Sequence, residues 1–174
     1  MKAQARRNAI MEVLQKEKEP VSASTLAKQF HVSRQIIVGD VALLRAGGAD
    51  ISATPKGYLL ARDRGGIVRQ IVCVHDGEQM GEELYICVDH GCCVLDVIVE
   101  HPVYGQLVGQ LQVSTRYEVN QFLSLAAKNG VHALSELTDG IHIHTLRCPD
   151  EAAFRRVWEA LDEKGFLVKN DEDS

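Results

Sequence analysis

Two histidines in the second half of the chain are spaced for joint metal binding. They are His142 and His144, in the run Ile141-His-Ile-His-Thr145. On a β-strand, residues two apart point to the same face, so the two imidazoles would lie side by side. Such a pair can hold one cation between its rings. The spacing alone leaves a second interpretation open, in which a solvent-facing strand carries two histidines with no ligand role.

A further group of donors lies earlier in the chain. His75 closes a β-branched run and is followed by Asp76 and an acidic segment with Glu78, Glu82 and Glu83. Imidazole and carboxylate together suit Zn²⁺, Ni²⁺, Fe²⁺ or Mn²⁺. Three histidines and one glutamate would leave a position open on a five- or six-coordinate metal. A nitrogen or carboxylate of a small molecule could fill that position.

The pattern of apolar residues around these donors predicts a mixed α and β domain. Strands are expected at residues 67–74, 92–100, 103–113 and 140–146, with a short strand at 166–168. Helices are expected at residues 77–89, after a cap at Ser114 or Thr115, and after a cap at Asp150. We expect the last residues, 170–174, to be disordered. The predicted domain covers residues 66–174 and begins at the last residue of a charged, glycine-rich linker, 62–66.

Residues 1–65 read as a separate, smaller domain. Helical periodicity covers residues 4–18, 22–30 and 33–46, with Pro20 ending the first helix and Gly47-Gly48 the third. Two short extended runs, 51–54 and 58–60, flank Pro55-Lys56-Gly57, which is typical of a hairpin turn. Three helices and a hairpin predict a winged helix-turn-helix.

A winged helix-turn-helix binds DNA by inserting the start of its second motif helix into the major groove. Here that helix opens with Ser33, whose hydroxyl and neighbouring amides suit a phosphate, followed by side chains able to contact bases. The residues expected to contact DNA are Lys28, Ser33, Arg34, Gln35, Val38, Arg45 and, at the tip of the wing, Lys56. Three-helix units also serve as protein-interaction modules, which is the alternative to DNA binding.

The distribution of charged residues differs between the two domains. Residues 1–65 contain 11 lysines and arginines against 6 acidic residues, whereas residues 66–174 contain 8 against 18. A basic head on an acidic body indicates that the head alone meets a polyanion. The sequence has no apolar run of membrane-spanning length and no secretory leader, so we expect a cytoplasmic protein. Five cysteines without a C-x-x-C pair are expected to be free, mostly buried thiols.

Two resemblances narrow these expectations. The stretch from Val21 to Arg45 resembles the helix-turn-helix of biotin-operon repressors, although no biotin-loading loop follows it. Three further stretches, Val74–Leu84, Asp96–Gly105 and Gly140–Leu146, resemble the three-histidine (3H) domain. Together, the chain from about Arg7 to Phe166 is similar to the niacin-responsive repressors of the NiaR type.

This resemblance implies an effector domain with an HPr-like two-layer α/β sandwich and a bound divalent metal. It implies His75, Glu83, His142 and His144 as the metal ligands, with Glu82 a neighbour that could be confused with Glu83. It also implies a homodimer that binds palindromic operator DNA with nicotinic acid as co-repressor, and shuts down genes of NAD synthesis or niacin uptake. The protein would then be a regulator and not an enzyme.

Two residues are candidates for contact with the effector. His101, in the run Glu-His-Pro-Val-Tyr-Gly, could line the pocket or could be a strand-end residue fixed by Pro102. Arg116, at a helix start, could pair with a carboxylate or could be a solvated surface residue. Three rival functions stay open at this point: a repressor whose signal is the metal itself, a regulator that senses another small acid, and a metal-dependent hydrolase.

Overall fold

The computed structural model describes residues 2–60, 65–130 and 133–169. The chain divides into two compact units, Met1–Arg64 and Gly65–Ser174. The first is mostly helical and the second combines a sheet with helices, which confirms the predicted mixed α and β class. Within the described ranges, no helix has both the length and the apolar character needed to cross a membrane. The predicted linker and the acidic tail fall largely on residues outside these ranges.

The first unit consists of three helices and a two-stranded hairpin. The elements are α1 (Ala3–Lys16), α2 (Ala23–Phe30), α3 (Arg34–Ala46), β1 (Ile51–Thr54) and β2 (Gly57–Leu60). Ser22 and Ser33 cap α2 and α3, because each side-chain oxygen accepts a hydrogen bond from the backbone N–H three residues later. Ile10, Leu26 and Ile37 are fully buried and bring one face of each helix into a common core.

The hairpin is fixed to the helices through a close backbone contact at Gly57. Tyr58 and Val21 exchange two backbone hydrogen bonds of 2.8 Å each. Gly57 has φ of +141°, and a Cβ at this position would lie 2.4 Å from the backbone of Val21. Only glycine meets both demands, so the glycine of the predicted turn is also what allows the wing to dock.

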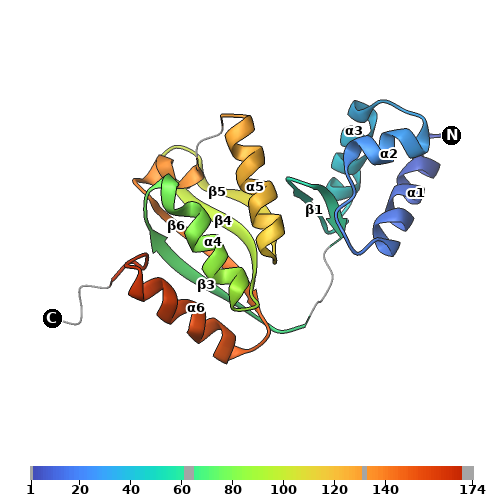
Figure 1. Ribbon diagram of the computed structural model, residues 1–174. Helices are drawn as coiled ribbons and strands as arrows, with labels where there is room; N and C mark the ends of the chain where they lie inside the picture. The colour runs from blue at the N-terminus through green and yellow to red at the C-terminus, as the bar shows by residue number, and fades with distance from the viewer. Residues whose placement is uncertain (1, 61–64, 131–132, 170–174) are drawn as a thin grey trace. The chain divides into compact units, whose positions relative to one another are not determined.

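The second unit is a four-stranded antiparallel sheet covered by helices on one face (Figure 1). Its strands lie in the order β3 (Ile67–Val74), β6 (Ile141–Cys148), β4 (Cys93–His101) and β5 (Gly105–Val113). The helices are α4 (Met80–Asp89), α5 (Arg116–Lys128) and α6 (Glu151–Glu163), with short 3₁₀ turns η1 (Gly77–Gln79) and η2 (Leu134–Thr138). This is the two-layer sandwich that the resemblance implied.

The core of the second unit lies between the sheet and the three helices. Alternate residues of each strand point into it, and they meet Leu84 of α4, Val119 of α5 and Val157 of α6, all less than 2% exposed. The last strand in the sequence, β6, lies between β3 and β4, so every residue of its inner face is enclosed. This central strand is the one that carries the His-x-His run.

Several predicted boundaries were wrong by two or three residues. The helix predicted from residue 77 begins with η1, because Asp76 caps a 3₁₀ turn before α4 starts at Met80. The strand predicted from Val103 begins at Gly105, since Pro102 to Tyr104 form a turn. Helix α1 ends at Lys16, short of Lys18. The predicted short strand at 166–168 makes a single β-bridge, between Leu167 and Cys73.

Candidate functional site

Three histidine rings converge on one buried glutamate in the second unit. The Nε2 atom of His75 lies 2.7 Å from Glu83 Oε2, and that of His144 lies 3.2 Å from the same oxygen. The Nε2 atom of His142 lies 3.1 and 3.2 Å from the two carboxylate oxygens. All four side chains are at most 4% exposed. The structure therefore brings together the four residues that the resemblance implied as metal ligands.

Each histidine is held by its other ring nitrogen. The Nδ1–H groups of His75, His142 and His144 donate to the backbone carbonyls of Asp76, Gly140 and Asp96, at 2.7, 2.8 and 2.7 Å. A carbonyl only accepts, so Nδ1 must carry the proton in all three rings. Each Nε2 then directs a lone pair at Glu83 unless the ring is charged. Lone pairs facing a carboxylate require a cation between them, either protons or a metal ion.

The backbone around Gly140 makes this convergence possible. In the antiparallel pair of β3 and β6, Cys73 lies opposite His142, and the chain at His75 passes directly beside Gly140. His75 N donates to Gly140 O, and a Cβ on Gly140 would lie 2.4 Å from His75 O. Gly140 also has φ of +88°. A side chain here would force the two strand ends apart and separate His75 from His142.

The fold also settles which neighbouring glutamate points inward. Glu83 lies in the first turn of α4 and is 1% exposed, whereas Glu82 is half-exposed and pairs with Lys164. The amino end of a helix carries partial positive charge, which favours an ionised carboxylate there. Sequence spacing alone could not separate two adjacent glutamates, because the choice depends on how α4 is rotated against the sheet.

The charges of the site are strongly coupled. Burial raises the pKa of Glu83, but the positive charge of His144 and the hydrogen bonds from the three histidines outweigh it and hold the pKa well below its usual value. Burial lowers the pKa of His75 and His144, yet the charge and hydrogen bond of Glu83 raise both above 6.5 overall. In the metal-free protein the site therefore attracts protons, as expected of a cation site.

Cys73 is a donor near this site that the analysis of the sequence missed. Its thiol is fully buried, and its sulfur lies within 4.8 Å of a carboxylate oxygen of Glu83 and of a ring nitrogen of His142. Burial, followed by the negative charge of Glu83, raises the pKa of the thiol far above its usual value. Position 73 lies two residues before His75, so strand alternation could have placed both on one face.

An open pocket of about 350 Å³ lies beside His75. Three carboxylate residues line it, namely Asp76, Glu136 and Asp139, together with Gly77 and Gly140. Its volume falls within the range of small-molecule sites, although its lining is acidic. A molecule in this pocket would lie next to one histidine of the cluster.

The two candidate effector residues have other partners. His101 Nδ1 accepts hydrogen bonds from the backbone N–H groups of Val103 and Tyr104, so it organises the turn between β4 and β5. The guanidinium of Arg116 makes two hydrogen bonds to Asp89 and lies 4.7 Å above the ring of Tyr85. Neither residue lines the pocket beside His75.

In the first unit, α3 presents the face expected to contact DNA. Arg34, Gln35 and Arg45 are exposed on it, and Val38 is 38% exposed. Ser33 caps the helix start, Lys28 is exposed on α2, and Lys56 is half-buried in the turn of the hairpin. Ser33, Arg34, Gln35 and Val38 lie at or near the start of α3, the part of the motif that enters the major groove, whereas Arg45 lies in its last turn and Lys56 in the hairpin. Contact of these residues with DNA stays a prediction.

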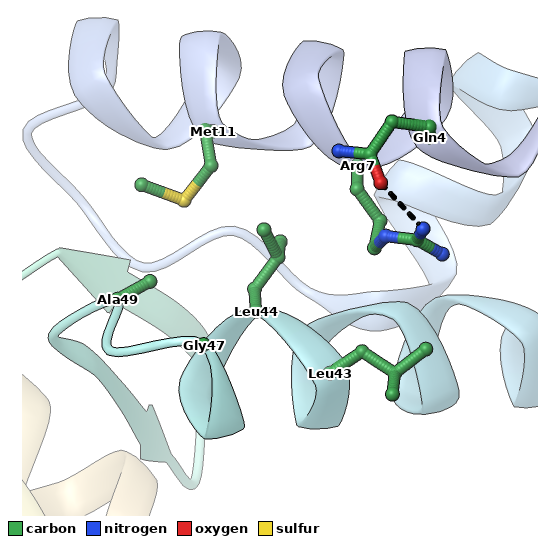
Figure 2. A pocket seen from close by; sticks show the side chains of 7 residues that line it. All are labelled: Gln4, Arg7, Met11, Leu43, Leu44, Gly47 and Ala49. Atoms are coloured by element: carbon green, nitrogen blue, oxygen red, sulfur yellow. Dashed lines mark hydrogen bonds between the residues drawn. The ribbon is translucent and has the colours of Figure 1, made fainter.

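A buried ion pair fixes the angle between α1 and α3. Asp40 of α3 is 4% exposed and accepts hydrogen bonds from Arg6 Nε at 2.6 Å and Arg7 Nη1 at 3.4 Å, both on α1. Arg7 also donates to Gln4, at the edge of a shallow apolar pocket between the two helices (Figure 2). Two of the basic residues counted in the head therefore serve structure, which the sequence did not reveal.

A winged helix-turn-helix followed in the same chain by a domain with a buried His₃Glu cluster defines a class of two-domain DNA-binding regulators. Comparison with known proteins agrees with this class. Residues 6–59 match a helix-turn-helix (HTH) domain family, and residues 68–170 match the 3H domain family. The chain belongs to the 3H-domain family, as the resemblance in the sequence suggested.

Two relatives cover nearly the whole chain. The probable transcription repressor NiaR of Thermotoga maritima is 43% identical over 166 residues, which span 95% of each protein. The transcription repressor NadR of Bacillus subtilis is 42% identical over 169 residues, 95% of this chain and 94% of that protein. The chain is thus a transcription repressor of the NiaR and NadR type and not an enzyme, which confirms the prediction that it regulates rather than catalyses.

Proposed function

We propose that this protein is a metal-containing repressor that binds operator DNA through α3 and the wing, with nicotinic acid as co-repressor. The observation that carries the metal assignment is the arrangement of the three histidines. Their Nδ1–H groups are all fixed to backbone carbonyls, and their Nε2 atoms all face the carboxylate of Glu83. This arrangement fits a divalent cation such as Ni²⁺, Zn²⁺, Fe²⁺ or Mn²⁺ held by His75, Glu83, His142 and His144.

The pocket beside His75 supports a small effector near the metal. The resemblance to niacin-responsive repressors suggests nicotinic acid as the effector, and the chemistry of this molecule suits a pocket next to a metal ion. It carries a pyridine nitrogen and a carboxylate, and a divalent cation supplies a positive charge that either group can approach. The acidic lining of Asp76, Glu136 and Asp139 disfavours a free anion, so binding should depend on the metal.

Repression would follow from a change in the geometry of a homodimer. A dimeric repressor needs its two α3 helices about 34 Å apart to enter successive major grooves. An effector that binds one dimer arrangement more tightly shifts the population towards it, by no more than its differential affinity. The regulated genes would be those of NAD synthesis or niacin uptake, in the cytoplasm.

Calorimetric titration of nicotinic acid tests this proposal. We expect saturable binding to metal-loaded protein and none to chelator-treated protein. Operator DNA should then bind more tightly when nicotinic acid is present. Binding that persists after chelation would exclude a metal-anchored effector. No binding in either state would exclude nicotinic acid.

A repressor that responds to the metal alone is the second candidate. The acidic lining of the pocket favours it, because carboxylates at Asp76, Glu136 and Asp139 attract cations rather than organic acids. In that case, operator binding would follow the metal concentration without any organic ligand. Titrations with nicotinamide and quinolinate beside nicotinic acid would identify a regulator of another small acid.

A further inference from the structure

The donor set of the site extends beyond nitrogen and oxygen. Cys73 lies on β3 directly opposite His142 on β6, in a register that also places His75 two residues further along the same face. Its sulfur belongs to a compact group with Glu83 and His142, in which the donor atoms all lie within 4.8 Å of one another. Two donors bound to one zinc ion at about 2.0–2.3 Å lie less than about 4.6 Å apart, so the three donors would draw closer together to share a cation.

The other cysteines do not share this position. None of the five described cysteines is in a disulfide, and Cys87, Cys92 and Cys148 are at most 1% exposed, like Cys73. Among the described residues, only Cys73 joins the group of donor atoms around Glu83. Cys73 packs in the hydrophobic core, as buried cysteines ordinarily do, but its sulfur also lies close to two potential metal donors, Glu83 and His142.

We propose that the thiolate of Cys73 is a further ligand of the cation held by His75, Glu83, His142 and His144. This inference rests on the proposed metal site. On binding, the S–H bond breaks, a sulfur–metal bond forms, and the proton passes to solvent. A sulfur donor favours zinc, cobalt or nickel over manganese or magnesium, which prefer oxygen. Cys73 therefore selects among the metals that three histidines and a carboxylate would accept.

Zinc-edge X-ray absorption on the zinc-loaded, full-length protein tests this directly, without any substitution. We expect one sulfur neighbour at about 2.3 Å beside nitrogen and oxygen neighbours at about 2.0–2.1 Å. A shell of nitrogen and oxygen alone would overturn the role of Cys73 and leave the His₃Glu site standing. Failure to bind zinc in a one-to-one ratio would overturn the metal site itself.

Cobalt substitution provides the matched comparison. Cobalt bound to a thiolate has a strong charge-transfer absorption in the near ultraviolet. We expect this band in the unmodified protein and in the control Cys87→Ala, which removes an equally buried thiol, but not in Cys73→Ala. The Cys73→Ala variant should also lose more affinity for zinc than for manganese. A band that survives in Cys73→Ala, or equal losses for both metals, would overturn the proposal.

Discussion

At the scale of single residues, the candidate site depends on which atom each side chain presents. His75, His142 and His144 come from two strands, yet all present Nε2, because backbone carbonyls hold each Nδ1. Glu83 is the common acceptor, and its burial leaves it no solvent to share its charge. The four side chains therefore act together, and their combined affinity for a cation should exceed the sum of their separate contributions.

Replacement of Glu83 tests that dependence. Glu83→Gln keeps the shape of the side chain and removes its charge, so the affinity for zinc should fall by more than about 100-fold, beyond the loss expected for an outer-shell partner. Glu82→Gln is the matched control, since Glu82 faces away and pairs with Lys164. Isothermal titration with zinc measures both variants. Equal losses in the two variants would contradict the inward role of Glu83.

The metal-free protein should respond to pH in the opposite direction to the metal-loaded one. Because Glu83 raises the pKa of His75 and His144 above 6.5, their contribution to stability is complete below pH 6.5 and is lost as pH rises through the raised values. Glu83, with a lowered pKa, contributes above pH 4.5 and loses its effect in more acidic solution. Metal binding needs neutral histidines, so it strengthens as pH rises.

Thermal melts from pH 5 to 9, with and without zinc, measure this difference. We expect the gap in melting temperature between the two states to widen with rising pH. A constant gap would mean that the histidines do not exchange protons for the metal.

At the scale of elements, most of the fold could be predicted and the fine positions could not. Caps at Ser22, Ser33 and Asp150 mark helix starts by local chemistry, and the structure confirms them. The choice of Glu83 over Glu82 depends on how α4 packs, which no local pattern encodes. The role of Asp40 is likewise non-local, because its partners Arg6 and Arg7 lie more than 30 residues away.

The junction of β3 and β6 should be sensitive to a single methyl group at Gly140. Gly140→Ala adds a Cβ that would lie 2.4 Å from a backbone oxygen, at φ of +88°. We expect a loss of about 1–3 kcal/mol in the free energy of unfolding, together with weakened metal binding. Gly130→Ala is the control, since Gly130 also has positive φ but open space around it. Chemical denaturation and zinc titration would report both effects, and equal losses would contradict the steric argument.

The contact between α1 and α3 should depend on Asp40. Asp40→Ala leaves the guanidinium groups of Arg6 and Arg7 partly buried without their carboxylate. We expect a loss of about 2–3 kcal/mol in the free energy of unfolding of the first unit, and weaker operator binding as α3 loses its brace. The exposed Asp50 offers a control as Asp50→Ala. Denaturation followed by circular dichroism measures the stability of both variants, and a gel-shift assay measures their operator binding. Equal effects of Asp40→Ala and Asp50→Ala would contradict the role of Asp40.

At the scale of the whole molecule, the two units should respond differently to metal. A ligand that binds only the folded second unit stabilises it by about 2.7 kcal/mol at a hundred times its dissociation constant. Added zinc should therefore slow hydrogen exchange at the amides of β3, β6 and α4. The exchange rates of the amides of α1, α2 and α3 should change much less when zinc is added. Protection spread evenly over both units would contradict a metal site confined to the second.

The position of β6 in the sheet also has a consequence during synthesis. His75 and Glu83 emerge from the ribosome first, but the strand that carries His142 and His144 comes 59 residues after Glu83 and must insert between β3 and β4. At about 5–20 residues per second, several seconds separate the first ligands from the last. An unfinished chain would thus hold only half of the proposed chelate, and the proposed metal could be bound only after β6 has been made.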